Sequence, residues 1–367
     1  MRSLILALSC LPAMARAEVP AVAVDIAPVH SLVSRVMQGV GTPDLVIPSG
    51  ASPHGYAMRP SEARSLSGAD LVVWIGPELT PWLSEPLEAL APTAAKLSLM
   101  DAQGMFHLSF REGVGFGEDA HEDDGHDEEG HGEEGHDEEG HDHEKHREEG
   151  HDDVAHNDEA HDEDGHDDHA QDEKGHDAEG HDDHAQDAHG HDHSAGGRDP
   201  HIWLDPVNAA VALDAIADAL ASLDPENAAT YRQNAQQGRM DLEALTQQIA
   251  KRLSAVKGQP FIVFHDAFYY FEARFDVEAV AAISTGDAAT PGPARVAALR
   301  TQVAKAAPVC AFTEPQMNTA LIHTVLEGQE AALATLDPLG ASLPLGVNLY
   351  GDLIMSMAAA MEECLAP

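Results

Sequence analysis

Histidine recurs every five residues from His121 to His191 in an acidic stretch in the middle of the chain. Thirteen of the fifteen positions in this register are His, and five further His residues lie out of register, at positions 143, 169, 184, 189 and 193. Imidazole is a good ligand for zinc, copper and nickel, and its ordinary pKa of about 6.5 leaves most of these side chains neutral near pH 7. The neighbouring carboxylates also concentrate cations. We predict weak accessory metal sites at His121, His126, His131, His136, His141, His151, His161, His166, His176, His181 and His191.

The composition of this stretch argues against a folded structure. Residues 118–195 contain 34 Asp or Glu and 3 Lys or Arg, and Val154 is their only large apolar side chain. Such a segment buries too little apolar surface to offset the entropy of an ordered chain. We therefore predict a disordered acidic loop over residues 118–198. A plain solubilising linker is the alternative, and whether the loop buffers, captures or senses metal stays open.

The charge distribution limits the classes of partner. The chain has a formal net charge of −44, of which residues 118–195 supply −31 and all other residues −13. Phosphate groups and anionic membranes attract basic surfaces. Binding to nucleic acid or to an anionic membrane surface is therefore disfavoured.

Three histidines outside the acidic stretch have surroundings typical of ligands. His54 lies in a loop after an apolar strand, His201 lies in Asp-Pro-His-Ile-Trp-Leu-Asp-Pro, and His265 ends the apolar run Phe-Ile-Val-Phe. Parallel sheets bind ligands at the carboxyl ends of their strands. Asp337 also follows a predicted strand, and three His with one carboxylate are a suitable zinc ligand set. We predict a metal site of His54, His201, His265 and Asp337, with water as the alternative fourth ligand.

The spacing of these residues indicates how they meet. His265 lies 64 residues after His201 and 72 residues before Asp337. His54 lies 147 residues before His201, or about 69 once the acidic stretch is left out. Each half of the chain can then contribute two ligands to a cleft between two lobes.

The order of apolar runs predicts an α/β fold. Continuous apolar runs separated by helical patterns indicate a parallel sheet that is covered on both faces. The pattern occurs once before the acidic stretch and again in the second half, so we expect two α/β lobes. Expected strands cover residues 21–25, 44–47, 69–75, 261–264, 277–283, 309–312 and 332–336, and expected helices 29–38, 61–66, 293–306 and 350–364.

One long helix is expected between the lobes, over residues 224–256. Asp224 is a suitable N-cap and Pro225 suits the first helical position. Apolar residues at three- and four-residue steps form one stripe, and Gly258 and Pro260 end the pattern. A rigid connector of this kind argues against a large hinge motion.

The first residues are typical of a secretory signal. Met1-Arg2, an apolar run and Ala15-Arg16-Ala17 predict cleavage after residue 17. This apolar run is too short to span a bilayer, and we expect no later segment to be long enough to do so. Cys310 and Cys364 then remain, and an even count in an exported chain predicts a disulfide that pins the last helix to the second lobe.

Six motifs together resemble one known family. They are Ala-Ser-Pro-His-Gly-Tyr-Ala-Met-Arg-Pro-Ser, Ala-Asp-Leu-Val-Val-Trp-Ile-Gly-Pro-Glu, Asp-Pro-His-Ile-Trp-Leu-Asp-Pro, Phe-His-Asp-Ala-Phe-Tyr-Tyr-Phe, Phe-Thr-Glu-Pro-Gln and Leu-Asp-Pro-Leu-Gly. The chain resembles the zinc-binding proteins of bacterial high-affinity zinc ABC importers, the ZnuA type of the cluster A-I solute-binding proteins. The resemblance implies two (β/α)4 lobes with parallel sheets, one long rigid linking helix and a metal site in the interlobe cleft. It also implies that His54, His201 and His265 are ligands.

Two positions indicate which metal ion the site would prefer. Some zinc-specific relatives have an acidic residue before the first ligand His, where this chain has Pro53. Manganese- and iron-binding relatives often have Glu at the third ligand position, where this chain has His265. Nitrogen ligands favour Zn²⁺, since carboxylate oxygens suit manganese better. Glu314 is expected to accept a hydrogen bond from a ligand His.

The predicted function is a periplasmic receptor that captures zinc and delivers it to the membrane permease of an ABC importer. We expect a soluble monomer. We also expect no catalytic activity, because the sequence has no HExxH motif, no G-x-S-x-G motif and no Cys/His nucleophile arrangement. Alternatives are a zinc enzyme, an extracellular metal buffer or adhesin, and a manganese-binding relative. The predicted layout is a signal peptide (1–17), an N-terminal lobe (18–117 and 199–223), the acidic loop (118–198), the linking helix (224–256) and a C-terminal lobe (257–367).

Overall fold

The computed structural model describes residues 19–116, 197–285 and 289–366. All of them belong to one unit of the chain. The predicted signal peptide and residues 118–196 of the predicted acidic loop, with all the accessory His residues, lie outside the described residues. Gly197 and Arg198, which were also assigned to that loop, are described, and Arg198 forms a β-bridge with Ser109, so disorder was the wrong prediction for these two residues.

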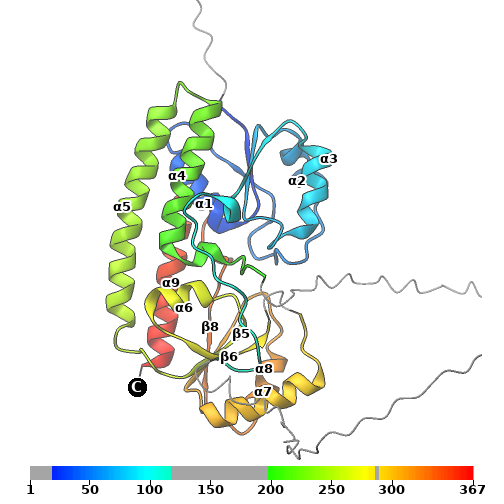
Figure 1. The fold of residues 1–367 in the computed structure, drawn as a ribbon, viewed down its shortest axis with the longest axis vertical. Helices are drawn as coiled ribbons and strands as arrows, with labels where there is room; N and C mark the ends of the chain where they lie inside the picture. The colour runs from blue at the N-terminus through cyan, green and yellow to red at the C-terminus, as the bar shows by residue number, and fades with distance from the viewer. Residues whose placement is uncertain (1–18, 117–196, 286–288, 367) are drawn as a thin grey trace, which may run out of the picture. The chain divides into compact units, whose positions relative to one another are not determined.

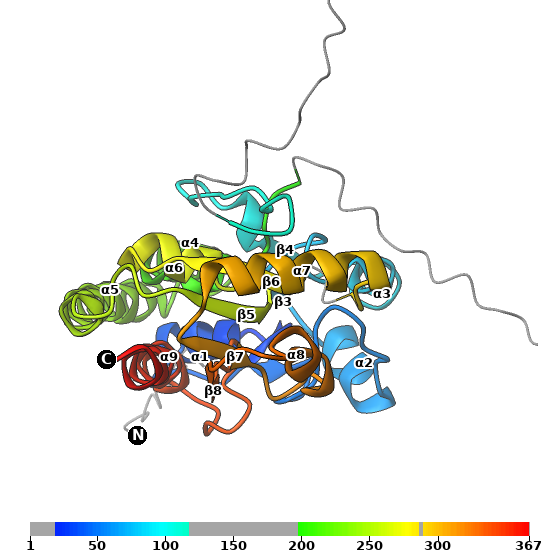
Figure 2. The same ribbon diagram turned by 90° about the horizontal axis from the view of Figure 1, so that it is seen from below.

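The N-terminal lobe is built on a four-stranded parallel sheet in the order β2-β1-β3-β4. Residues 19–116, which form most of this lobe, run from blue to cyan in Figures 1 and 2. All residues of the central strands β1 and β3 are buried, as the continuous apolar runs predict. The strands and helices of this lobe are β1 (Val22–Val24), α1 (Ala27–Val36), β2 (Asp44–Leu45), α2 (Pro60–Ser67), β3 (Leu71–Trp74), η1 (Pro81–Leu83), α3 (Ser84–Leu90), β4 (Ala95–Ser98), η2 (Leu99–Asp101) and η4 (Ile202–Leu204).

The C-terminal lobe repeats this arrangement with the parallel order β6-β5-β7-β8. Every residue of the central strands β5 and β7 is buried. The two parallel sheets confirm the predicted fold class. The elements are β5 (Phe261–His265), α6 (Tyr269–Phe275), β6 (Ala279–Ser284), α7 (Pro293–Ala306), β7 (Cys310–Thr313), α8 (Ala320–Val325), β8 (Ala332–Thr335) and α9 (Leu349–Leu365).

Two packed helices, α4 (Pro206–Leu223) and α5 (Ala228–Leu253), replace the single helix expected over residues 224–256 (Figure 1). The prediction that Asp224 is an N-cap was wrong. Its backbone N–H donates to the carbonyl of Leu220 and so ends α4, while its carboxylate accepts hydrogen bonds from Asn227 and Tyr231. Asn227 is the N-cap of α5. The long connector exists, but at 26 residues it is about 39 Å long.

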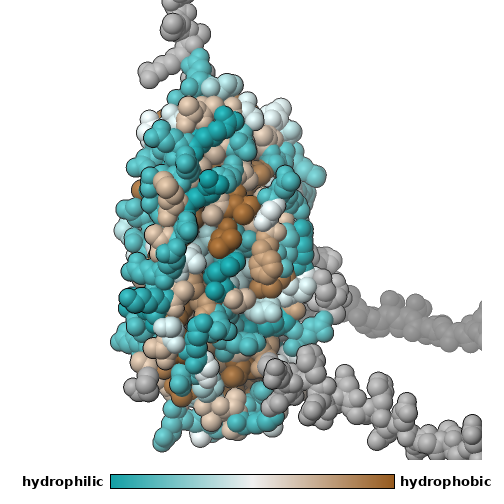
Figure 3. All heavy atoms as spheres, turned by 60° about the vertical axis from the view of Figure 1, so that its left-hand side comes forward, coloured by the Kyte–Doolittle hydropathy of each residue, from teal (hydrophilic) through white to brown (hydrophobic). Residues whose placement is uncertain are grey.

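Among the described residues, α4 alone is long and apolar enough to cross a membrane by length and composition, with a mean hydropathy of 1.3. The expectation that no later segment meets that criterion was therefore wrong. Half of α4 is buried inside the unit, where it packs against α5, which is the environment of a core helix. Figure 3 brings this side of the unit forward and shows a mainly hydrophilic surface with some apolar side chains.

One apolar core cluster extends through both lobes, and a second, smaller cluster lies within the C-terminal lobe. One contiguous cluster of buried side chains includes Val73 in β3, Ile249 in α5, Phe312 in β7 and Met357 in α9. Helix α9 packs against both α1 and α5. Because close-packed interiors resist deformation, α5 and α9 together hold the lobes in one arrangement.

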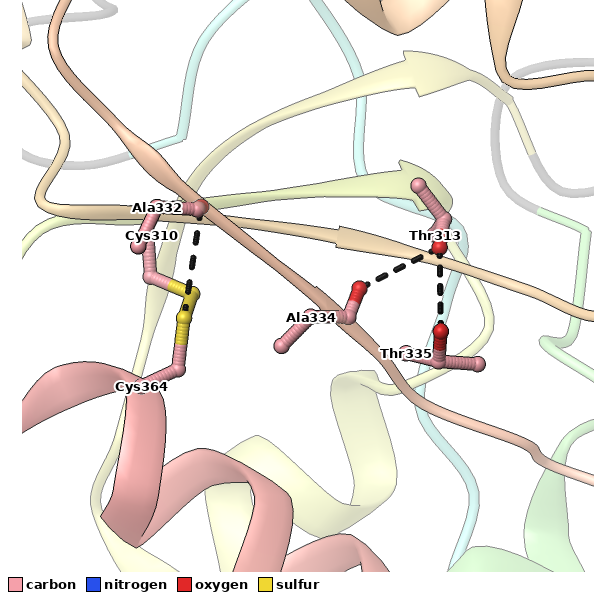
Figure 4. Close-up of a disulfide and its surroundings, with 6 residues drawn as sticks. All are labelled: Cys310, Thr313, Ala332, Ala334, Thr335 and Cys364. Carbon is pink, nitrogen blue, oxygen red and sulfur yellow. Dashed lines mark hydrogen bonds between the residues drawn. A yellow bond between two sulfur atoms is a disulfide. The ribbon is translucent and has the colours of Figure 1, made fainter.

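A disulfide fixes the end of α9. Cys364 on α9 is bonded to Cys310 at the start of β7, with the two Cα atoms 5.9 Å apart (Figure 4). The bond closes a loop over 54 residues of sequence. It therefore ties the C-terminal helix to the second sheet, and through α9 to the core that both lobes share.

A buried carboxylate ties together the strand ends of the N-terminal lobe. Asp25 follows β1 and is fully buried, and its two oxygens accept the backbone N–H groups of Ile26 and Ile75, each at 2.8 Å. Its carbonyl accepts the N–H of Ile47, which leads into the His54 loop. Burial raises the pKa of Asp25 to about 7, although the hydrogen bonds from Ile75 and Ile26 oppose the rise.

This pKa predicts a specific pH dependence of folding. The native state keeps the Asp25 proton from about pH 4 to about pH 7, whereas the unfolded state loses it, so stability falls as the pH rises through that window. Asp25→Asn has no carboxyl group to titrate at this position, so its stability does not fall for this reason. The stability of the variant relative to the parent should therefore rise by up to a few kcal/mol between pH 4 and 7 and then level off. Urea unfolding of both metal-free proteins measures the difference, and a value independent of pH would contradict the assignment.

Candidate metal centre

Three histidines converge at the carboxyl ends of the strands, and each comes from a different segment. His265 is the last residue of β5. His201 directly precedes η4. His54 lies in the loop after β2, where the indole N–H of Trp82 donates to the carbonyl of Pro53 at 2.8 Å. Gly50 enters this loop with φ of 86°, a conformation that favours glycine.

The three rings lie close enough to share one ion. Their centroids are 5.5 Å apart for His54 and His201, 5.1 Å for His54 and His265, and 5.0 Å for His201 and His265. One ring nitrogen from each lies within 4.8 Å of the other two. In a tetrahedral zinc site with Zn–N bonds of about 2.0–2.1 Å the ligand nitrogens are roughly 3.4 Å apart. Small side-chain adjustments would therefore bring all three nitrogens onto one metal ion.

The surrounding cavity is small and partly apolar. It has a volume of about 20 Å³, which is room for roughly one water-sized guest. Such a space suits a single ion and excludes an organic substrate. Its lining comes from both lobes and consists of Ser52, Pro53, His54, His201, Trp203, His265, Glu314, Gln316, Met317, Pro338 and Leu339.

A carboxylate lies near the Nδ1 atom of two of the three histidines. Asp199 lies 2.7 Å from Nδ1 of His201 and also accepts the His201 backbone N–H at 2.9 Å. Glu314 lies 3.5 Å from Nδ1 of His265, at the outer limit of hydrogen-bond distance, so its expected acceptor role stays a prediction. A carboxylate at Nδ1 favours the tautomer with its proton there, which leaves Nε2 as the metal-binding nitrogen.

The environment of Asp199 is unusual for a carboxylate. Burial raises its pKa to about 7, against the lowering effects of the His201 N–H and of the charges on Arg111 and His265. Sequence reasoning did not single out this residue, although it lies two positions before His201 within the Asp-Pro-His motif.

Asp337, the predicted fourth ligand, is engaged elsewhere. Its carboxylate accepts the backbone N–H groups of Leu339, Gly340 and Ala341. It lines a separate cavity with Thr335 and Ser356. Within the described part of the chain, the residues that could hold one ion together are His54, His201 and His265, without Asp337.

Two other buried polar residues have structural roles. His30 is buried, and its Nε2 lies 3.1 Å from the carbonyl oxygen of Pro43. Asp266, next to His265, is buried and bonded to Arg111. Sequence reasoning missed Arg111 entirely, because its partners lie 155 and 161 residues further along the chain.

The sequence and the fold both match known zinc-uptake proteins. The family described as "Zinc-uptake complex component A periplasmic" matches the chain over residues 22–364. The chain belongs to this family. It is 41% identical over 352 residues to the high-affinity zinc uptake system protein ZnuA of Paracoccus denitrificans, covering 96% of this chain and 93% of the relative. Against the ZnuA of Brucella suis biovar 1 (strain 1330), the identity is 40% over 345 residues, or 94% and 91% of the two chains.

A solved structure supports the fold independently. The structure titled "Crystal structure of ZnuA" superimposes with a TM-score of 0.65 at 19% identity and covers 95% of this chain and all of that chain. Membership of the family confirms the predicted resemblance, the periplasmic location and the role in zinc uptake. It also indicates a binding and transport protein rather than an enzyme.

The contact between Asp199 and His201 should tune metal affinity. In Asp199→Ala the His201 ring loses the group that holds its orientation, so zinc affinity should fall by about 10- to 100-fold. Zinc competition titration against a chromophoric chelator measures this change. Asp214→Ala, which breaks an exposed ion pair with Arg239, is the matched control and should bind as the parent does. An Asp199→Ala affinity within twofold of the parent would contradict the assignment.

Proposed function

We propose that the chain holds one zinc ion at His54, His201 and His265 and hands it to the membrane permease of an ABC importer. The convergence of these three imidazoles at the strand ends of both lobes carries the proposal. Family membership makes the chain the zinc-binding component of an uptake system, which implies a permease partner. The proposal includes these three ligand residues. It also includes a monomeric protein that has no nucleic-acid partner.

The donor set supports zinc over manganese. All three converging groups are imidazoles, and two of them are buried, with His201 at 1% and His265 at 2% exposure. Imidazole nitrogen suits zinc, whereas manganese prefers sites rich in carboxylate and water oxygen. A manganese-binding function would need a carboxylate in the group, and the nearby candidate Asp337 is bonded to three backbone N–H groups.

The fourth ligand stays open between Asp337 and water. Ligation by Asp337 would require its carboxylate to give up hydrogen bonds to the loop of Leu339, Gly340 and Ala341. A water needs no such rearrangement. We therefore favour water, with the three histidines as the protein ligands.

The cavity supports binding and release rather than catalysis. Zinc enzymes also carry a water at the fourth position, and there that position must in addition admit a substrate. Here Trp203, Met317 and Leu339 line a space of about 20 Å³ around the histidines, which suits one ion or one water rather than an organic substrate. The accessory sites predicted in the acidic loop remain a proposal, in which they add weak, exchangeable zinc to the one tight site.

Zinc titration of single-residue variants tests the site. Replacing His54, His201 or His265 by Ala removes one of three protein ligands, so the tight phase should weaken by at least about 100-fold, more than is typical for loss of a supporting residue. Asp337→Ala should cost little if water is the fourth ligand. His323→Ala, on helix α8 of the C-terminal lobe, is the matched histidine control. Tight binding at parental strength in any of the three ligand variants would refute the site.

Growth under zinc limitation tests the transport role. A strain without this protein should grow poorly in the presence of a zinc chelator and recover on addition of zinc. The parental gene should restore zinc uptake and growth, and a His265→Ala copy should not. Normal growth with unchanged zinc uptake in the deletion strain would show that the chain is not the receptor for zinc import.

A further inference from the structure

The two chain segments that flank residues 117–196 are hydrogen-bonded to each other. The N–H of Phe110 donates to the carbonyl of Gly197 at 3.1 Å, and the N–H of Asp199 donates to the carbonyl of Leu108 at 2.8 Å. Ser109 and Arg198 form an antiparallel bridge between these bonds. We call residues 108–111 with residues 197–199 the paired stem.

One tyrosine of the C-terminal lobe holds both strands of the paired stem. The hydroxyl group of Tyr270 accepts the N–H of Leu108 at 2.9 Å and donates to the carbonyl of Asp199 at 2.9 Å. Tyr270 lies in α6 and is 1% exposed. Leu108 follows η2 of the N-terminal lobe in the chain, and Asp199 precedes η4 of the same lobe. The buried phenol oxygen of Tyr270 therefore connects both flanking segments to the C-terminal lobe.

A buried arginine makes a second connection. The guanidinium of Arg111 contacts the carboxylates of Asp266 and Glu272, with Nε at 3.0 Å from Asp266 and a terminal nitrogen at 2.6 Å from Glu272. The three side chains are 8%, 4% and 1% exposed. The rings of Phe116 and Tyr269 cover the guanidinium, with centroids 3.8 and 4.5 Å away.

The chain beyond Arg111 stays on the C-terminal lobe. Phe116 donates its N–H to the carbonyl of Val280 in β6 at 2.8 Å, and Arg295 of α7 donates to the carbonyl of Gly113 at 3.0 Å. Figure 1 shows this segment, in turquoise, running down alongside the C-terminal lobe. The paired stem and its extension thus cross from one lobe to the other.

Both connections end beside proposed zinc ligands. Asp266, which holds Arg111, directly follows His265 in the chain. Asp199, whose carbonyl is held by Tyr270, contacts Nδ1 of His201 at 2.7 Å through its carboxylate. A shift of the paired stem would therefore move the backbone next to one ligand and the supporting carboxylate of another.

A role in stability alone is a weaker account of this arrangement. Taking an arginine and two carboxylates out of water carries a desolvation penalty that can exceed the attraction between them, so buried ion pairs are weak evidence for stability. The planar guanidinium does fix direction, because it bonds two carboxylates in a rigid fork. Fixed geometry matters most beside a metal ligand, where supporting residues set ligand orientation.

We propose that the paired stem is an interlobe clamp in which Arg111 and Tyr270 are positioning residues that hold His265 and His201 in the geometry that retains zinc. The clamp rests on the proposed site at His54, His201 and His265. Neither Arg111 nor Tyr270 contacts the metal in this proposal, and their effect passes through Asp266 and Asp199.

The rate of zinc release tests the clamp in the full-length chain. Zinc-loaded protein is mixed with excess chelator, and the slowest phase, one zinc per chain, is followed by stopped flow. We expect release about 10-fold faster or more in Arg111→Ala, on the scale typical of lost supporting residues. Arg111→Lys keeps the charge but loses the fork and should release at an intermediate rate. Tyr270→Phe, which removes only the hydroxyl, should also release faster than the parent.

Arg252→Ala is the matched control, because Arg252 pairs with Glu362 between α5 and α9 and contacts no residue of the site. It should keep the parental release rate. Urea unfolding of each metal-free variant measures the purely structural effect. Parental release rates in Arg111→Ala and Tyr270→Phe would overturn the clamp, even if both variants were less stable. If Arg111→Ala does not fold, Arg111→Lys and Tyr270→Phe decide the question.

Failure of the clamp and failure of the site give different results. Parental release in the clamp variants, with the slow phase lost in His265→Ala, would reject the clamp and leave the site intact. A parental slow phase in His265→Ala would reject the site itself, and with it the clamp.

Discussion

Three imidazole rings from distant parts of the chain must be held within 5.5 Å of one another, and the rest of the structure depends on this constraint. Two of the rings are buried, and burying polar groups is costly unless they have partners. Asp199 and Glu314 meet part of this need by approaching the Nδ1 atoms of His201 and His265. A carboxylate at Nδ1 also favours the tautomer in which Nε2 would face the proposed ion. The same contacts therefore offset part of the cost of burying the rings and orient them as the proposed zinc site requires.

The frame that satisfies this constraint is rigid. The two sheets share one apolar core with α5 and α9, and the Cys310–Cys364 disulfide ties α9 to β7. Hydrogen bonds also cross between the lobes close to the site, since the indole N–H of Trp203 donates to the carbonyl of Pro338 and the hydroxyl of Tyr350 donates to the carbonyl of Trp203. A receptor built in this way would load and release zinc through local movements around the site, because lobe closure would disrupt a close-packed core.

Much of this architecture could be predicted from the sequence, because its central features are local. The buried strands β1, β3, β5 and β7 are continuous apolar runs, and the histidines follow such runs or lie within a distinctive motif. Features set by tertiary contacts escaped prediction. Edge strand β4 is exposed or half-buried along its length and so has no apolar run.

The remaining differences have similar causes. Asp224 has the residue type of an N-cap, yet it ends α4 because its side chain is drawn to Asn227 and Tyr231. Asp337 has the residue type and position of a ligand, and the sequence did not show that its carboxylate also accepts the N–H groups of the loop that follows it; its ligand role stays a prediction. Arg111 lies in an unremarkable sequence, and its importance depends on carboxylates more than 150 residues away.

Anomalous diffraction at the zinc absorption edge, from crystals of the zinc-bound full-length protein, tests the central claim most directly. The account predicts one strong peak bonded to His54, His201 and His265 at about 2.0–2.1 Å, with the two lobes arranged as they are here. Zinc bound tightly without these three histidines, or bound only after a rotation of one lobe against the other, would contradict it.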